Sequence, residues 1–387
     1  MMKTLANAVP SLREFTAEAP VVTGISAELA AEWKVLSEAA SEPNAFGEWW
    51  FVDSALRLLR GNETVRLAQV RDSDGILIGT MPLAISPRHG RLPVASIGNW
   101  IHLQCYCGIP LIRAGDECAF WIALLDLLDR SQWATGFLSL RLIYANGPVM
   151  RGLEDAVKVS RRNLGIAEQY DRATLASKSD PAAYMETTIR PKKRKELRRQ
   201  AKRLAEQGTV AFERLAADGN VAGWSEQYLA LENSGWKGKG GTALAMKDEW
   251  SQYFRENMAS AHALGKLDFL RLTLDGRAIA MLVNLRAPPA VWSYKITFDE
   301  SLARFSPGVL IEIEAIPLLL GDPQIDFADS CAKPGHPMIN SLWGERQSIV
   351  HVTVSLKGPI RQLTYLGCRS FDALGTLVRR NGTQNDD

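Results

Sequence analysis

The sequence predicts an α+β fold of two lobes, each a mixed, mostly antiparallel sheet flanked by helices. Three observations carry this prediction. The chain has 387 residues, which suits two domains of about 100–200 residues each. Hydrophobic residues make up 46% and charged residues 23%, as in ordinary globular proteins. The order of helical and strand patterns in the first half largely recurs in the second half, which suggests two related units.

The first half is divided into elements by hydrophobic periodicity and by turn residues. It is expected to contain helix 45–59, strands 64–71 and 75–86, helix 117–128 and strand 137–143. Residues 170–181 are polar and unpatterned, so we expect a crossover between the halves there. The predicted lobes are therefore residues 1–175 and residues 176–387.

The second half begins with a basic helix and then repeats the same order of elements. It is expected to contain helix 190–203, strand 210–214, helices 221–232 and 247–264, strands 267–274, 277–286 and 290–297, helix 306–320 and strand 349–354. Asp275–Gly276 is a strong two-residue hairpin turn, and Ser306 with Pro307 suits a helix start. An antiparallel meander followed by a helix indicates an α+β layout and not a regular βαβ repeat.

Composition excludes several classes of protein. Forty-five Lys+Arg against 43 Asp+Glu leave a formal charge of +2, so a basic surface must be local. Five cysteines, an odd number, favour free buried thiols and a cytoplasmic location. The Cys105–Cys107 spacing is too short for the usual zinc motif, so no metal site is expected. No apolar run reaches ~18 residues, so no membrane span is expected. Residues 1–30 and the last dozen are expected to be frayed tails.

Three stretches of the second half resemble a known family. They are LENSGWKGKGGTAL at 231–244, WSYKITFDE at 292–300 and RFSPG at 304–308. With the basic helix they span about residues 185–330, and they resemble acyl-CoA acyltransferases of the GNAT superfamily, specifically the CelD-like family of cellulose biosynthesis. The first half, through its order of elements and NAFGEW at 44–49, resembles the degenerate GNAT-like lobe shared with Fem-type peptidyltransferases.

The resemblance implies that an acceptor amine or hydroxyl attacks an acyl thioester directly, without a covalent enzyme intermediate. Acetyl-CoA or another acyl-CoA would be the co-substrate, and no cofactor would be bound permanently. The acceptor would be a small molecule or glycan, such as a sugar or an envelope or exopolysaccharide precursor. Two alternatives remain open, namely a Fem-type transferase that uses aminoacyl-tRNA and a catalytically inactive GNAT-like binding module.

The turn before the last long helix is the predicted phosphate site. Helix N-termini bind anions through free N–H groups and the helix dipole, and Gly308 would let a phosphate approach the backbone. The usual phosphate loop of the superfamily has two glycines, whereas this turn has one, so a plain Ser-Pro helix start is the alternative. The predicted coenzyme-binding residues are Arg304, Phe305, Ser306, Gly308 and Val309.

A glycine-rich stretch with lysines is the predicted acceptor wall. Four glycines within seven residues, at 235–241, favour a loop over a helix interior and permit positive φ. Trp236 would stack on a sugar ring, and Lys237 and Lys239 would bind an anionic group. The alternative is a solvated connector whose tryptophan packs into the core.

The strand 291–297 is expected to line the cleft with one of its faces. Strict alternation would place Trp292, Tyr294 and Ile296 on one face and Ser293, Lys295 and Thr297 on the other. Tyr294 could donate a proton to the leaving thiolate, and Lys295 is a predicted substrate-binding residue. A tyrosine on such a strand is more often a core residue.

A carboxylate is the expected base for the acceptor. Glu232 is the leading candidate because it ends the helix before the glycine-rich stretch. Asp299, Glu300 and His336 are alternatives, and Glu232, Tyr294 and Asp299 form the predicted catalytic set. No Ser-His-Asp pattern is visible in the sequence.

Nine cations and one acid, Glu196, lie between Arg190 and Arg203. Such a helix could bind an anionic acceptor, the coenzyme or a membrane surface peripherally. No nucleic-acid recognition module accompanies it, so no specific nucleic-acid partner is expected. A merely solvated basic face is the alternative.

Overall fold

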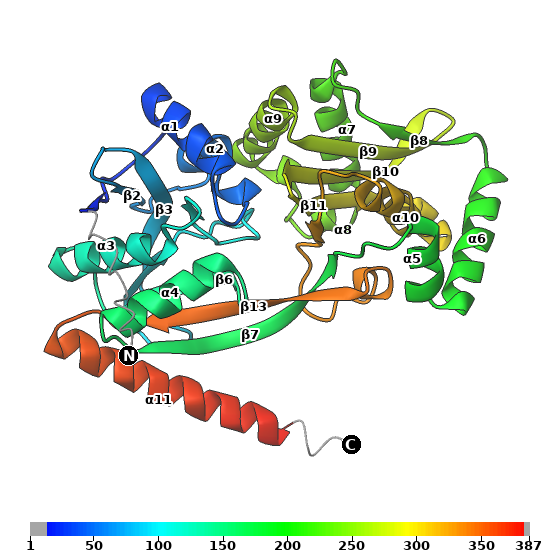
Figure 1. Ribbon diagram of the computed structural model, residues 1–387. Coiled ribbons are helices and arrows are strands. Elements are labelled where there is room, and N and C mark those ends of the chain that lie inside the picture. Colours follow the sequence, from blue (N-terminus) through cyan, green and yellow to red (C-terminus); the bar gives the residue numbers. More distant parts are fainter. Residues whose placement is uncertain (1–13, 383–387) are drawn as a thin grey trace, which may run out of the picture.

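The computed structural model describes the backbone of residues 14–382 and the side chains of residues 14–372. One mixed, mostly antiparallel sheet of 13 strands runs through both lobes, with helices on its faces (Figure 1). The strand order is β1-β2-β3-β4-β6-β13-β7-β12-β11-β10-β9-β8, and β5 pairs with β3 beside this path. The predicted fold class is confirmed.

The N-terminal lobe carries the first eleven elements. They are β1 (Thr16–Glu18), α1 (Ala27–Glu38), η1 (Ala45–Gly47), α2 (Trp49–Leu58), β2 (Arg66–Arg71), β3 (Leu77–Ser86), β4 (Ser96–Asn99), β5 (Leu111–Ile112), α3 (Glu117–Arg130), β6 (Leu138–Tyr144) and α4 (Pro148–Val159). The predicted helix 45–59 is divided because Asn44 caps a short 3-10 turn before α2 begins.

The remaining elements begin with β7, which joins the lobes, and continue through the C-terminal lobe to α11. They are β7 (Leu164–Leu175), α5 (Pro181–Thr188), α6 (Pro191–Ala205), β8 (Val210–Arg214), α7 (Val221–Ser234), α8 (Trp236–Lys239), η2 (Leu244–Met246), α9 (Asp248–Ala263), β9 (Leu267–Leu274), β10 (Arg277–Ala287), β11 (Ala290–Phe298), η3 (Glu300–Phe305), α10 (Pro307–Leu320), β12 (Phe327–Asp329), η4 (Ile339–Ser341), β13 (Glu345–Val354) and α11 (Pro359–Gly382).

The two lobes repeat one order of elements. The series β1-α1-α2-β2-β3-β4-α3-β6 recurs as β8-α7-α9-β9-β10-β11-α10-β12. Each series ends in a parallel strand pair, β4 with β6 and β11 with β12, whereas the other pairings are antiparallel. This repeat explains why the hydrophobic pattern of the first half recurs in the second.

Two long strands join the lobes. β13 pairs with β6 of the N-terminal lobe and with β7, and β7 also pairs with β12 of the C-terminal lobe. Figure 1 shows both strands running side by side below the lobes. The sheet is therefore continuous across the boundary predicted after residue 175.

Two regions differ from the sequence prediction. Residues 170–175 are the second half of β7 and not a crossover. The sequence did not indicate a strand there because the buried Arg172 interrupts its apolar pattern. The predicted tail 1–30 contains β1 and the first residues of α1, and the predicted C-terminal tail contains the last part of α11. Arg361 anchors α11 through hydrogen bonds to the carbonyl of Asp129 at the end of α3 and to that of Ala134 in the loop that follows. Residues 1–13 and 383–387 of these tails lie outside the described residues.

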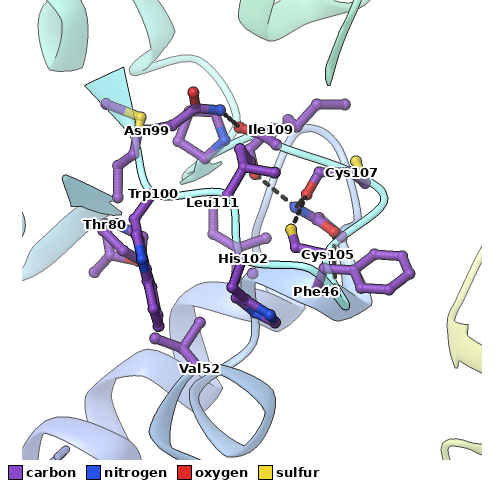
Figure 2. Close-up of a pocket in the computed structure, with 17 residues that line it drawn as sticks. Phe46, Val52, Thr80, Asn99, Trp100, His102, Cys105, Cys107, Ile109 and Leu111 are labelled. Atoms are coloured by element: carbon purple, nitrogen blue, oxygen red, sulfur yellow. Dashed lines mark hydrogen bonds between the residues drawn. The ribbon is translucent and has the colours of Figure 1, made fainter. Parts of the chain in front are cut away.

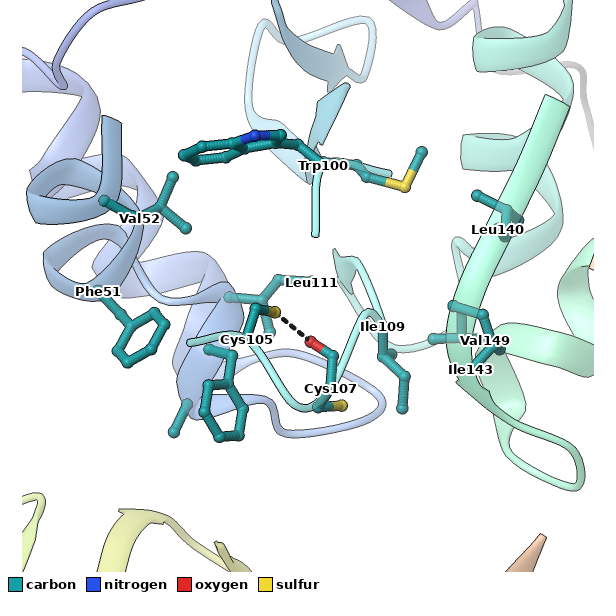
Figure 3. Close-up of a cluster of buried hydrophobic side chains, with 14 of the residues drawn as sticks. Phe51, Val52, Trp100, Cys105, Cys107, Ile109, Leu111, Leu140, Ile143 and Val149 are labelled. Atoms are coloured by element: carbon teal, nitrogen blue, oxygen red, sulfur yellow. Dashed lines mark hydrogen bonds between the residues drawn. The ribbon is translucent and has the colours of Figure 1, made fainter. Parts of the chain in front are cut away.

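One large hydrophobic core lies between the lobes. It joins Phe46 and Phe51 of the N-terminal lobe to Tyr253 and Trp292 of the C-terminal lobe, and Figure 3 shows the N-terminal side of this cluster. A second core fills the space under α10. All five cysteines are free, as expected, and three of them are buried. Close packing between the lobes fixes the position of the residues described next.

Candidate active site

A β-bulge re-aims the side chains of β11. Val283 of β10 lies opposite Lys295, but its neighbour Asn284 lies opposite Ser293, so Tyr294 is an extra residue with no partner on β10. The bulge reverses the alternation of faces beyond it. As a result Lys295 lies on the same face as Tyr294, with its ammonium group 4.9 Å from the centroid of that ring. The predicted faces are therefore wrong, since Ile296 turns to the core under α10.

β11 also separates from its parallel neighbour. β12 pairs with β11 only through residues 290–292, so the backbone of 293–298 has no strand beside it on that edge. The bulge and this free edge coincide. The sheet therefore has an open edge next to Lys295, where the Ile296 carbonyl lies 3.5 Å from Lys237 Nζ, and an extended ligand can bind to an edge of this kind.

Lys295 occupies a nearly dry environment at this edge. Its ammonium group lies 5.8 Å from the ring centroid of Tyr106, which a loop of the N-terminal lobe contributes. Burial, with a smaller contribution from the nearby Lys237, lowers the pKa of Lys295 to about 8, although Glu232 opposes this shift. The side chain keeps limited access to solvent, although protein surrounds the ammonium group. A lysine in this state can exchange protons near neutral pH.

Glu232 lies at the end of α7, as predicted, and is almost fully buried. Its carboxylate accepts hydrogen bonds from Lys237 Nζ and from the backbone N–H of Leu244, both at 2.8 Å. Tyr228 donates a longer bond of 3.5 Å to it. Glu232 therefore holds the stretch 237–244 against α7 and lies close to Lys295.

Tyr294 is buried beside Tyr253 and Tyr106. Burial raises the pKa of Tyr294 well above its usual value, and the charge of Tyr106 raises it further. Its hydroxyl forms no hydrogen bond of good geometry with any described residue. The tyrosine is therefore neutral and can only donate or share its proton.

A buried ion pair underlies the separation of β11 and β12. Arg172 of β7 contacts Asp329 of β12 at 3.1 Å, and Tyr144 of β6 donates to the same carboxylate at 2.9 Å. Arg172 also donates to the carbonyl of Tyr106, and the Tyr144 hydroxyl accepts from the indole N–H of Trp292. This network was not predicted, because its only signal in the sequence is a charged residue, Arg172, within an otherwise strand-like stretch.

The start of α10 departs from an ordinary phosphate loop. Ser306 has a left-handed φ of 55°, and its carbonyl accepts from the N–H groups of Val309 and Leu310. Gly308 is buried against Phe298, so a Cβ there would lie 3.0 Å from that ring. Pro307 has no N–H, so the Gly308 N–H is the free donor at this helix start. Arg304 stacks on Phe305 and is exposed.

A cavity of about 910 Å³ adjoins this helix start. Ser306 and Val309 line one side, and α6 lines the other with Arg190, Lys192 and Lys193. The remaining wall comes from 337–346, including Arg346. The structure thus brings two of the predicted coenzyme residues together with the predicted basic helix. The four cations that line the cavity outnumber its one acid, Glu196.

Other predicted residues surround Glu300. Glu300 accepts from the backbone N–H of Trp236 and from Lys239 Nζ. Trp236 is 62% exposed and begins the single helical turn α8, so the stretch 235–241 is not wholly a loop. Only Gly241 among its four glycines has positive φ. The other three lie within the helical turn α8 or cap its two ends.

Asp299 caps the turn η3 through Ser301 and pairs with Arg277 at 2.7 Å. Although partial burial acts in the opposite direction, hydrogen bonds from Ser301 and Arg277 lower the pKa of Asp299. His336 is exposed in the loop after β12. The structure therefore brings Glu232, Lys237, Tyr294 and Lys295 together and places Asp299 and His336 elsewhere.

Residues 191–322 match the family model described as the acetyltransferase (GNAT) domain. The C-terminal lobe therefore carries a GNAT-type acetyltransferase domain. No curated protein sequence matches the chain. Residues 14–372 contain no group of three or more side chains that could hold a metal ion. No helix in the described part is long and apolar enough to cross a membrane.

Solved structures show the same two-lobed fold at low identity. FemX is 9% identical, with a TM-score of 0.58 over 86% of this chain and 98% of that chain. The C-terminal domain of a putative lysylphosphatidylglycerol synthetase from Agrobacterium fabrum is 12% identical, with a TM-score of 0.51 over 88% and 95%. L-PGS from Bacillus licheniformis is 11% identical, with a TM-score of 0.50 over 88% and 96%.

Proposed function

We propose that the protein is an acyl-CoA-dependent N- or O-acyltransferase whose acceptor attacks the thioester directly. The observation that carries the proposal is the coincidence of the bulge at Tyr294, the open edge of β11 and the half-buried Lys295. A thioester laid along this edge would meet both free backbone groups and a proton-exchanging side chain. Positioning of this kind is the main requirement of direct acyl transfer.

The donor's phosphates would occupy the cationic cavity between α6 and α10. The Gly308 N–H and the helix dipole would add to the charges of Arg190, Lys192 and Lys193. Because Ser306 uses its own carbonyl to bind Val309 and Leu310, the cations and not the turn would supply most of the attraction. The basic helix then has a role within the catalytic lobe.

The proton balance can be closed by residues already described. The acceptor nitrogen or oxygen forms a bond to the carbonyl carbon, the carbon–sulfur bond breaks, and the acceptor proton must reach the departing thiolate. Neutral Lys295 would accept that proton, and Lys295 or the neighbouring Tyr294 would return one to sulfur. Glu232 remains the alternative base, although Lys237 and Leu244 already occupy its carboxylate.

The acceptor would enter over the stretch that begins at Trp236. The exposed indole could stack on a sugar ring beside Lys239. We propose an acceptor among sugars and envelope or exopolysaccharide precursors, which is the class that the CelD-like resemblance implies. The cytoplasm is the proposed location of the reaction.

A Fem-type reaction with aminoacyl-tRNA as donor is the second candidate. It is favoured by the fold that the chain shares with FemX and by the nine cations of 190–203. Both candidates use the same edge of β11, so they differ in the donor and not in the acyl-transfer chemistry.

Calorimetry with acetyl-CoA, a long-chain acyl-CoA and an aminoacyl-tRNA tests the proposal. We expect saturable binding of an acyl-CoA, and a concentration of 100 Kd should stabilise the fold by ~2.7 kcal/mol. Turnover should fall strongly in Lys295→Met and less in Glu232→Gln, while Lys158→Met at an exposed site serves as the matched control. Saturable tRNA binding at physiological salt together with aminoacyl turnover would replace this proposal with the Fem-type reaction. Ligand binding without any turnover would indicate an inactive module.

A further inference from the structure

α11 presents an apolar face that no described part of the chain covers. Figure 1 shows the helix along the outer edge of the molecule, beside β7 and β13. Its exposed apolar side chains are Ile360, Leu363, Leu366 and Phe371, at 79%, 71%, 54% and 44% exposure. Monomeric proteins rarely leave several large apolar side chains together on one helix face without a binding partner.

The opposite face of α11 is firmly docked, so this exposure does not arise from a detached helix. Arg361 donates to the carbonyls of Asp129 and Ala134 at 3.0 and 2.7 Å. Tyr365 is buried against Phe137, and their rings make an edge contact at 5.8 Å. These contacts fix which side of the helix faces outward.

Further contacts extend this anchoring along the helix. Arg369 donates to the carbonyl of Ile166 at 2.8 Å, and His89 contacts Asp372 at 3.1 Å. The docked positions 361, 365, 368 and 372 follow helical spacing, as do the outward positions 360, 363 and 371. α11 therefore has two distinct faces, one bound to the N-terminal lobe and one apolar and solvent-facing.

The charges of α11 distinguish between its possible partners. Over 359–382 the sequence has four arginines and a single acid, Asp372, which already contacts His89. A second copy of the helix would bring these like charges together in a symmetric pair with no free carboxylate to balance them. Apolar side chains with an excess of arginine instead suit the interface of an anionic bilayer.

We propose that α11 binds anionic membrane surfaces as an interfacial helix. Ile360, Leu363, Leu366 and Phe371 would enter the boundary between headgroups and acyl chains, while the helix axis stays parallel to the membrane. The positive net charge of the sequence over 359–382 would attract anionic headgroups. The inference rests on α11 alone and is independent of the donor bound by the C-terminal lobe.

Vesicle flotation of the full chain tests this proposal. We expect binding to vesicles of phosphatidylglycerol, weak binding to vesicles of phosphatidylcholine, and release as salt is raised. Leu363→Asp should lower the partition coefficient about tenfold, because an apolar side chain is replaced by a charge at the interface. Val35→Asp on α1, at a position 65% exposed, is the matched control and should bind as the parent does.

Two further measurements separate the alternatives. Charge reversal of Lys195 and Arg198 tests whether α6 is the membrane contact, and loss of binding in that variant with retention in Leu363→Asp would overturn the proposal. Sedimentation velocity tests self-association, and a dimer that Leu363→Asp dissociates would assign the face to a second copy. Equal binding of the parent and Leu363→Asp, with unchanged melting of both, would also overturn it.

Discussion

Each lobe ends in a parallel strand pair, β4 with β6 and β11 with β12. Only in the N-terminal lobe does a side chain bridge the backbone where the two strands separate. There, Asn99 follows the last paired residue of β4 and donates to the carbonyls of Gly108 and Arg141, both at 2.8 Å. Its side-chain oxygen also accepts from the N–H of Arg141. In the C-terminal lobe the corresponding place, after Trp292 and Asp329, carries a bulge and Lys295.

The lobes also differ in their cavities. The N-terminal pair adjoins a cavity of about 230 Å³, which Gly98, Ser139 and His351 line. Figure 2 shows a second N-terminal cavity, about 30 Å³, enclosed by residues such as Asn99, Trp100 and His102. Such a volume holds a single water. Burial lowers the pKa of His102 to about 3, so its imidazole is neutral. The cationic cavity of the C-terminal lobe is about 910 Å³. The largest of these three cavities therefore belongs to the lobe that carries the candidate active site, and it lies between α6 and α10.

The largest expected effect concerns Lys295. Lys295→Met should lower kcat by about 10²–10⁴-fold, which is the usual contribution of a general base or acid. Since the neutral amine is the active form and its pKa is about 8, log kcat should rise with pH below 8 and level off above it. Lys295→Arg should be equally slow and lose this pH dependence, because the guanidinium stays charged. If Lys295→Met turned over as fast as the parent, Lys295 would have no catalytic role, and this difference between the two lobes would be lost.

In the N-terminal lobe, the equivalent substitution should affect stability and not catalysis. Asn99→Ala leaves backbone groups of Gly108 and Arg141 unsatisfied and should lower the free energy of unfolding by ~1–3 kcal/mol. Urea denaturation measures this change. Asn146→Ala, at an exposed position, should stay within ~0.5 kcal/mol of the parent. An Asn99→Ala variant of parental stability but lower kcat would instead give the N-terminal lobe a direct catalytic role.

A smaller effect is expected within the cationic cavity. Lys192→Ala removes one charge from its lining and should weaken donor binding roughly three- to tenfold, with a shallower dependence on salt. Calorimetry at two salt concentrations measures both quantities. Lys202→Ala, on the same helix but outside the cavity lining, should bind as the parent does. If both variants lost donor affinity equally, the positive charge of the whole helix would attract the donor, and the cavity would not be a defined phosphate site.

The smallest expected effect is that of Trp236→Ala. Loss of a stacking partner should raise the acceptor KM about two- to tenfold with little change in kcat, as for a contact made equally in the ground and transition states. The indole is largely exposed, so the melting temperature should not change. Steady-state kinetics with varied acceptor measures the effect. An unchanged KM combined with a lower melting temperature would make Trp236 a structural residue.

The elements of the C-terminal lobe could be predicted closely because local signals mark their ends. Asp275 and Gly276 both have positive φ, as their hairpin turn requires, and β9 and β10 have the predicted starts. Pro307 begins α10 and Gly321 follows it, as the helix signals indicated. These residues act through their own backbone preferences, so the sequence alone is sufficient to place them.

The arrangement of the site depends on long-range contacts that local patterns cannot encode. The bulge at Tyr294 is a property of the register between β10 and β11, so alternation along β11 misplaced Lys295 and Ile296. Tyr106 comes from an unpatterned loop of the other lobe. Arg172 became compatible with a buried strand only because Asp329, 157 residues further along the chain, neutralises it.

The position of β13 has a consequence for how the chain folds. β13 is the last strand to be synthesised, yet it lies between β6 and β7 and completes the sheet that joins the lobes. Until it inserts, β6 and β7 keep open edges that can pair with other chains. We therefore expect the nascent chain to be most prone to aggregation just before residues 345–354 leave the ribosome. The docking of α11 follows this step and closes the molecule after the sheet is complete.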